Sequence, residues 1–402
     1  MAVFCNPRVF SGRATSRAIL ILLASRNVGL PVLSRRRSAA PRYTRESGKP
    51  AREKAMPYRS KRKWHELDLL CQAGLGLVTI APAICRTLRE IIGAGAVSLF
   101  WLDEQGMPAG VFHENASASA LDLFVNEYDR LFTGPSEINV SQVAATSGRP
   151  VGHLMNPGHD YFRSNTFNLL VRANGHFHTL DLRVDVANRA RAIVMLFREE
   201  QKPFTDDDAS CLKQAVPYLK LAIEREPAEG RWERPAFGGH MLVDRSGTKL
   251  LTVNDEAIRL LKSCTMVGTN VRFVGPTTAP PRFAQDLCRR LESSLAVQDI
   301  VEVPWGRLRL TATLMQPAAS EATAQVLISL EMEKPKRLKL IEKILDLSLS
   351  PLQRRIALIA ALGGKRSDCL ANISNEALKK HLVVIYGATG VNSWEGLTKV
   401  FQ

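Results

Sequence analysis

The chain has 402 residues, of which 45% are hydrophobic and 23% charged, so it is long enough to form two or three domains with ordinary cores. Its formal net charge is +15, but residues 1–63 alone hold 16 lysines and arginines against two acidic residues. The rest of the chain is therefore nearly neutral. The high overall charge by itself gives no argument for binding to nucleic acid.

The cysteines and the N-terminal segment bear on the compartment. The seven cysteines are widely spaced and include no C-x-x-C pair, which argues against a disulfide framework and a thiolate zinc site. The apolar run 18–24 is too short to span a bilayer. We expect residues 1–63 to be a basic disordered tail or sequence upstream of a mis-assigned start, with a signal or transit peptide as the alternative. We therefore expect a cytoplasmic protein with no membrane partner.

Residues 64–225 are predicted to form a first α+β domain. The predicted helices are 64–77, 81–92, 119–132 and 204–224, and the predicted strands are 96–102, 107–112, 168–171, 176–184 and 190–198. Thr205 is placed to cap the last helix, and three aspartates follow at the positive end of that helix. This order of elements, with Pro203 and Phe204 before the cap, resembles a GAF-type sensor domain.

Two groups of side chains in this domain are candidates for binding a ligand or a metal. The first group is His153, His159, Tyr161 and Phe162. The GAF resemblance implies that their region walls a small-molecule pocket, although aromatic residues on a loop also commonly cover a core. The second group is His176 and His178, which offer half of a metal site or simply pack and form hydrogen bonds. We predict no metal.

A second α+β domain is predicted after a linker. Residues 226–238 are rich in proline, glycine and charge, which is typical of a linker, and residues 239–333 follow as the domain. It opens with a strand, an Asp-x-x-Gly turn and a strand over 241–251, then a helix from Asn254, and this opening resembles a PAS domain. The further predicted strands are 271–273, 300–303, 308–315 and 324–332. Residues 334–348 are expected to form a connecting helix.

Residues 349–402 are predicted to form an all-α domain of four helices. The first helix has Ser350 at its N-cap and Pro351 next, and it ends at two glycines. The second covers 365–371, the third runs from Ser374 to Gly390, and the fourth opens at Ser393. Two short helices joined by a tight turn and supported by two others give the helix-turn-helix geometry.

Ordered landmarks recur along this C-terminal stretch. They are Leu349, Ser350, Pro351, Ile356, Gly363, Ile373, Ser374, Leu378, Lys379, His381, Leu382, Ile385, Tyr386, Gly390 and Val391. The set closely resembles the LuxR-type signature of bacterial transcription regulators. The resemblance implies that the third helix enters the DNA major groove and that the fourth forms the surface of a homodimer. A ligand or partner of the sensor-like domains would control binding by a population shift.

The predicted contacts to double-stranded DNA lie on the third helix. They are Ser374, Asn375, Lys379, Lys380, His381 and Val383. A helical wheel places Lys379, Lys380 and Val383 opposite the apolar stripe, where lysines reach phosphates or base edges. On charge alone, the lysine pair also fits a merely solvated helix face.

The sequence departs from the LuxR-type pattern in ways that leave a second hypothesis open. The stretch from Gly363 to Ser374 is about two residues shorter than usual, and Ala377 and Val383 replace polar residues. Fewer polar groups therefore face DNA, and binding should rely on a dimer. The alternative is a signalling or interaction protein whose degenerate helix-turn-helix no longer binds DNA.

An enzymatic role is not expected. The sequence contains no G-x-x-x-x-G-K-[ST] loop, no H-E-x-x-H motif and no Ser-His-Asp pattern. Three consecutive aspartates, 206–208, are better explained by the start of a helix than by a metal site. We predict no catalytic residues and no cofactor.

Overall fold

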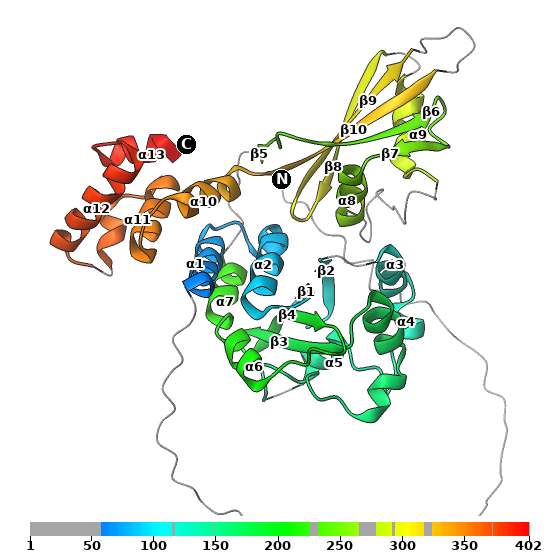
Figure 1. The fold of residues 1–402 in the computed structure, drawn as a ribbon, viewed down its shortest axis with the longest axis horizontal. Helices are drawn as coiled ribbons and strands as arrows, with labels where there is room; N and C mark the ends of the chain where they lie inside the picture. The colour runs from blue at the N-terminus through cyan, green and yellow to red at the C-terminus, as the bar shows by residue number, and fades with distance from the viewer. Residues whose placement is uncertain are drawn as a thin grey trace, which may run out of the picture. The chain divides into compact units, whose positions relative to one another are not determined.

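The computed structural model of the chain describes residues 58–114, 117–146, 148–225, 232–264, 279–291, 294–316, 324–371 and 373–401. In these ranges the protein is a mixed α+β structure with antiparallel sheets, which confirms the expected α+β class (Figure 1). None of the helices described there is long and apolar enough to cross a membrane. The expected strand at 271–273 and residues 1–57 of the expected tail lie outside the described residues.

Two helices precede the first sheet. Helix α1 (Tyr58–Gln72) begins before the expected position 64, so the last residues assigned to the tail are helical. Helix α2 (Leu77–Ile92) ends at Gly93, whose φ of 70° is the left-handed conformation that favours glycine at a C-cap.

The first sheet is four-stranded, in the order β2-β1-β4-β3. Its strands are β1 (Ala96–Leu102), β2 (Pro108–His113), β3 (His178–Val186) and β4 (Arg189–Arg198). Strands β3 and β4 are joined through Ala187 and Asn188, with φ of 50° and 61°, the positive values of a tight hairpin turn. The register pairs Ser98 of β1 with His113 of β2.

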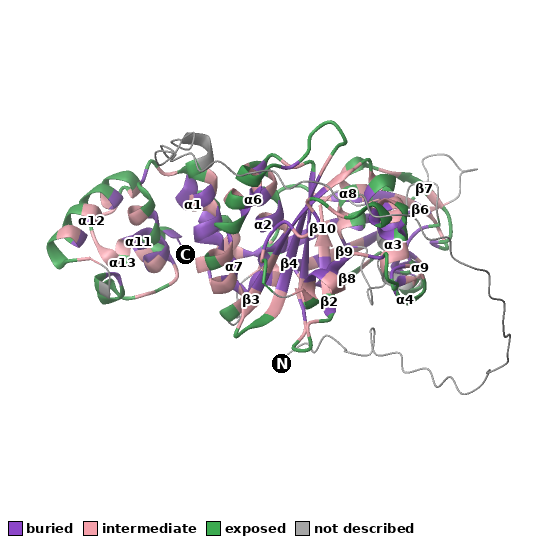
Figure 2. Ribbon diagram, turned by 90° about the horizontal axis from the view of Figure 1, so that it is seen from below, coloured by how far each residue is buried: buried purple, intermediate pink, exposed green. Residues whose placement is uncertain are grey.

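Both faces of this sheet are covered. All residues of β4 from Ala192 to Phe197 are buried, and buried residues run along the strands in Figure 2. One face contacts α2, α6 (Asp206–Lys213) and α7 (Val216–Glu224). The other face packs in an apolar cluster that includes residues of α5 (Val140–Ala145) and of the segments η2 (His159–Arg163) and η3 (Thr166–Val171).

The helix expected over 204–224 is divided in two. Thr205 caps α6 as expected: its side chain accepts a hydrogen bond from the Asp208 backbone N–H, and the Asp208 side chain accepts one from the Thr205 backbone. The chain then breaks before α7, which carries Pro217 in its first turn. Proline lacks the N–H group that would continue the first helix.

The segment between β2 and β3 differs most from expectation. The expected helix 119–132 is α3 (Ala118–Asn126) and the short α4 (Tyr128–Leu131). The expected strand at 168–171 is wrong, because these residues belong to η3, a π-helix. The buried Glu137 carboxylate accepts hydrogen bonds from the Asn165 and Thr166 backbone N–H groups, both at 2.8 Å, and so fixes the start of η3. A short helix, η4 (Arg172–Asn174), leads to β3.

The second sheet has the order β7-β6-β10-β9-β8, and β5 pairs with β10. Its strands are β5 (Trp232–Glu233), β6 (Gly239–Asp244), β7 (Leu250–Val253), β8 (Ala296–Val303), β9 (Gly306–Met315) and β10 (Gln325–Pro335). Strand β5 lies inside the expected linker. Side chains of α8 (Asp255–Cys264) and α9 (Arg282–Arg290) share the core of this sheet, and α9 was not predicted.

Helices alone follow the second sheet. They are α10 (Lys336–Asp346), α11 (Pro351–Ala361), η6 (Arg366–Ala371), α12 (Asn375–Thr389) and α13 (Trp394–Phe401). The expected caps are present: Ser350 accepts from the Gln353 N–H and Ser374 from the Ala377 N–H. The second of the expected four helices, η6, is a 3₁₀-helix, which is tighter than an α-helix.

No disulfide joins two cysteines in the described part of the chain. Those that are buried are Cys71, Cys85, Cys264, Cys288 and Cys369, whereas Cys211 is half-buried. Burial raises the pKa of the Cys264 thiol to about 12. Such thiols remain protonated at neutral pH and pack as small apolar side chains.

Candidate DNA-binding surface and ligand cavity

Helix α12 presents two chemically different faces. Leu378, Leu382 and Ile385 are buried, whereas Lys379 and Lys380 are exposed. This separation follows from the helical period, because residues three and four apart share a face. The lysine pair therefore projects from a helix whose opposite side is anchored in an apolar core.

The remaining predicted DNA contacts lie around the lysine pair. Ser374 and Asn375 are exposed at the N-terminus of α12, and the Ser374 hydroxyl is 3.2 Å from the Ala377 N–H that it caps. Val383 is 71% exposed, and His381 is half-buried. Val383 shares the exposed side of the helix with the lysine pair, whereas His381 lies nearer the buried stripe. The contact of these residues with DNA remains a prediction.

Two of the C-terminal arginines are occupied elsewhere. Arg354 is buried and donates hydrogen bonds to the backbone carbonyls of Leu345 and Leu347, each at 3.2 Å. Arg355 forms an ion pair of 2.7 Å with Asp68 of α1. Apart from these two arginines, the exposed cations of this region are Lys365, Arg366, Lys379, Lys380 and Lys399. Fewer cations are therefore free to meet DNA than the sequence count suggests.

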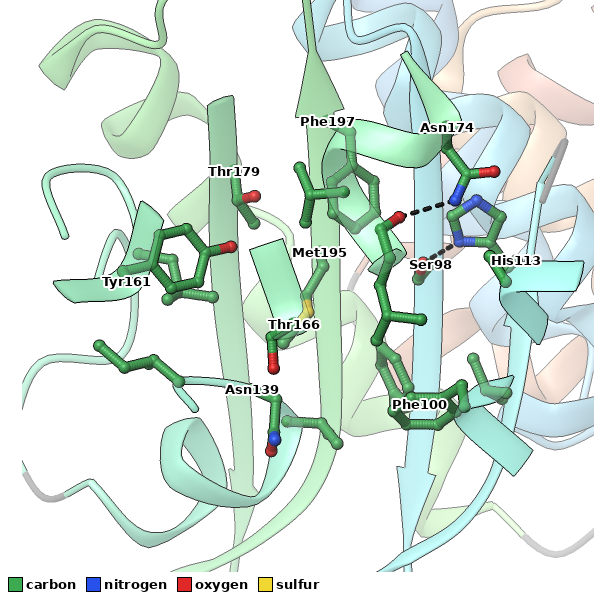
Figure 3. Close-up of a pocket in the computed structure, with 18 residues that line it drawn as sticks. Ser98, Phe100, His113, Asn139, Tyr161, Thr166, Asn174, Thr179, Met195 and Phe197 are labelled. Atoms are coloured by element: carbon green, nitrogen blue, oxygen red, sulfur yellow. Dashed lines mark hydrogen bonds between the residues drawn. The ribbon is translucent and has the colours of Figure 1, made fainter. Parts of the chain in front are cut away.

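An apolar cavity lies on the face of the first sheet that η2 and η3 cover (Figure 3). Its wall includes the aromatic and aliphatic side chains of Phe100, Phe124, Ile138, Leu154, Met195 and Phe197. The space open to water-sized molecules is about 80 Å³. One water needs only about 10–15 Å³, so the cavity has room for a small molecule.

Several polar side chains in the cavity wall are already engaged. Asn139 accepts a hydrogen bond from the Tyr128 hydroxyl at 3.0 Å and donates to the Phe132 carbonyl at 2.7 Å. The Thr166 hydroxyl donates to Glu137 at 2.6 Å. These groups hold the wall together, because buried polar groups are stable only when they are paired.

His113 differs from these groups in that one of its ring nitrogens, like the Thr179 Oγ1, has no hydrogen-bond partner among the described residues. Its Nδ1 forms a hydrogen bond with the Ser98 hydroxyl, whereas its Nε2 is buried and finds no hydrogen-bond partner among the described residues (Figure 3). Burial, together with the nearby His176, lowers the pKa of His113 to about 4. The imidazole is therefore neutral at pH 7.

The four ligand-binding candidates named from the sequence do not lie together. Tyr161 is buried and lines the cavity, so this part of the ligand hypothesis has a structural counterpart. The Phe162 ring packs on the Phe167 and Phe177 rings at centroid distances of 5.1 and 5.6 Å, and it covers the core. His159 is exposed and His153 half-buried, and neither lines this cavity.

His176 and His178 do not come together with other metal ligands. His176 stacks on the Phe197 ring at 5.5 Å, and His178 Nε2 lies 2.9 Å from the Glu200 carbonyl oxygen. No cluster of three or more His, Cys, Asp or Glu side chains suited to a metal occurs in the part of the chain that the structure describes.

Sequence reasoning missed His113 and Ser98. Ser98 interrupts an otherwise apolar strand, and His113 directly follows the strand predicted over 107–112. A polar residue within a buried strand was the available signal, since it requires a partner. The register that pairs the two residues could not be read from either strand alone.

Comparisons with known proteins give little further guidance. No protein-family model matches the chain, and no curated protein matches it. The chain is similar to the solved E. coli DhaR(N)-DhaL complex at 12% identity and a TM-score of 0.21, covering 69% of this chain and 91% of that one. It is also similar to the sensor region of a sensor histidine kinase at 13% identity and a TM-score of 0.16, covering 68% and 93%. Similarities this weak carry no argument about function.

Proposed function

We propose that the chain is a DNA-binding transcription regulator of the LuxR type, in which GAF-like and PAS-like sensor regions control a C-terminal helix-turn-helix module. The observation that carries the proposal is the exposed Lys379–Lys380 face of α12, opposite a buried apolar stripe. A capped helix of this kind can enter a DNA major groove, which is about 12 Å wide.

The side chains of this face suit two kinds of contact with DNA, one to phosphates and one to bases. The lysine ammonium groups would meet phosphates, which position a protein without reading sequence. Exposed Val383 can contact the methyl group of a thymine, and Asn375 can donate and accept hydrogen bonds at base edges. With few free cations, one module would bind weakly, and a homodimer would supply the second half-site.

The test is a fluorescence-anisotropy titration of the full chain with labelled promoter duplex at several salt concentrations. The variant Lys379→Ala/Lys380→Ala should weaken binding and reduce the salt slope by about 2, because each phosphate contact contributes about 1. The matched control is Lys249→Ala/Lys262→Ala, which removes the same charge from exposed positions near the second sheet. Both variants keep the basic N-terminal segment, so its contribution cancels. An unchanged slope in the first variant would refute the assigned surface.

A second candidate function is protein interaction without DNA binding. It is favoured by one observation, since the helix before the turn is the 3₁₀-helix η6 in a stretch that is shorter than the LuxR-type pattern. In that case the full chain and both double variants would bind duplex DNA alike, through the N-terminal basic segment only. Size-exclusion chromatography with light scattering would then show whether α12 and α13 still support self-association.

A further inference from the structure

The wall of the cavity in Figure 3 is uncharged. Among the described residues that line it, none is Asp, Glu, Lys or Arg. His113 is neutral at pH 7, and so is Tyr161, because burial raises its pKa to about 12. An unpaired charge moved into such surroundings is strongly unfavourable, which argues against phosphates, carboxylates and ammonium groups as occupants.

Two buried polar atoms of the cavity wall, Nε2 of His113 and Oγ1 of Thr179, have no hydrogen-bond partner among the described residues. Nε2 of His113 is buried and lacks a hydrogen-bond partner among the described residues, while Ser98 holds the opposite ring nitrogen. A buried donor or acceptor left unpaired is unfavourable, and a bound molecule can relieve this. Depending on the tautomer, Nε2 donates or accepts. A hydroxyl group does both, so it suits either tautomer.

The dimensions restrict the occupant further. The space open to water-sized molecules is about 80 Å³, and the cavity opens partly to solvent. A dry apolar cavity of about 150 Å³ takes up benzene, so a single ring is the upper limit of size here.

We propose that this cavity binds a small uncharged molecule, aromatic or aliphatic and no larger than one ring, whose hydroxyl group hydrogen-bonds to Nε2 of His113. The proposal deepens the sensing part of the proposed function, on which its regulatory meaning rests. Its test contains no DNA, so the two proposals can fail separately.

The experiment is a ligand-observed NMR titration of the full chain at pH 7 with phenol, benzene and benzoate as probes. Phenol should bind about 2- to 10-fold more tightly than benzene, which is the effect of one net hydrogen bond, and benzoate should not bind. His113→Phe should remove the preference for phenol over benzene. The matched control His240→Phe changes an exposed histidine and should keep the preference.

A second variant tests the location without removing the histidine. Ala120 is 5% exposed and lines the cavity, so Ala120→Leu fills it from α3. Phenol binding should be lost while the circular-dichroism spectrum stays unchanged. The proposal is overturned if neither phenol nor benzene binds, if benzoate binds as well as phenol, or if Ala120→Leu leaves phenol binding intact.

Discussion

The two sheets of this protein differ in the pattern of burial along their strands. In the first sheet, successive residues of β4 are buried regardless of the face to which they point. In the second, β9 alternates from Gly306 to Thr313 between buried residues such as Leu308 and Leu310 and half-buried ones such as Arg309 and Thr311. The first sheet is covered on both faces, whereas the second has one apolar and one polar face.

The two sheets also differ in what lies on one of their faces. On the polar face of the second sheet, Arg309 forms an ion pair of 2.7 Å with the buried Glu333. On the first sheet, the covering layer is made of short helices and connecting segments. The cavity beside His113 lies between this layer and the sheet.

The largest expected effect tests the double coverage directly. Ile193 and Leu196 point to opposite faces of β4, and both are fully buried. Ile193→Ala and Leu196→Ala should each lower the free energy of unfolding by about 2–5 kcal/mol. On the second sheet, Ile328→Ala should do the same, but Thr311→Ala on the polar face should change it by less than about 0.5 kcal/mol. Urea unfolding measures all four, and a small effect of Leu196→Ala would contradict the coverage of the second face.

The next effect concerns acid stability, which should depend on the first sheet. The folded pKa of His113, about 4, lies below its ordinary value of 6.5. Between these values the unfolded chain binds a proton that the folded chain does not, so stability falls as the pH drops from 6.5 to 4 and then levels off. The loss is at most about 3 kcal/mol.

The pH effect can be assigned by comparing variants. His113→Phe should flatten the dependence of the unfolding free energy on pH in thermal or urea denaturation between pH 7 and pH 4. Burial also lowers the pKa of His176, so His176→Phe is the matched variant that separates the two histidines. If His113→Phe keeps the full slope, the imidazole is not buried in the neutral form.

A smaller effect tests the covering layer itself. Glu137→Ala leaves the Asn165 and Thr166 N–H groups without their acceptor and should destabilise the first domain by about 1–3 kcal/mol. Glu137→Gln keeps one acceptor oxygen and should be milder. Hydrogen exchange at the η3 backbone should accelerate in the alanine variant. Unchanged protection there would mean that η3 is held by packing rather than by the carboxylate.

The smallest expected effect compares one helix cap in each domain. Thr205→Ala removes the cap of α6, and Asn254→Ala removes an acceptor for the Ala257 N–H of α8 and the His240 N–H of β6. Each should lower the unfolding free energy by about 1 kcal/mol. The asparagine change should be the larger, because it also loses a bond to the sheet. Equal melting-temperature shifts would show that this second bond contributes nothing.

The sequence predicted best those features whose causes are local. The caps at Thr205, Ser350 and Ser374 involve residues only three positions away, and all are present. The alternation in β9 and β10 likewise reveals strands without reference to the rest of the chain. Helix α9 carried a readable signal, since Phe283 and Leu287 recur at helical spacing after a proline, but that spacing was missed.

The features that escaped prediction depend on distant residues. The apolar run at 168–171 fits a strand in isolation, but a carboxylate about thirty positions earlier fixes it as a π-helix. Nothing near His113 in the sequence shows that it will be buried beside His176 and Phe197. The predicted DNA-binding face of α12 was readable because one helix contains it entirely, and its function remains to be tested.

The buried thiols lie in three regions of the molecule, so the rate at which each region opens can be measured separately. Cys71 and Cys85 lie in α1 and α2 before the first sheet, Cys264 and Cys288 belong to the second sheet's core, and Cys369 lies in η6. A thiol that is buried and protonated reacts with an alkylating reagent only when its region opens. Mass spectrometry of alkylated peptides from the unmodified protein would therefore report the opening rates of three regions. A ligand or DNA would reveal where it acts by the region whose alkylation it slows.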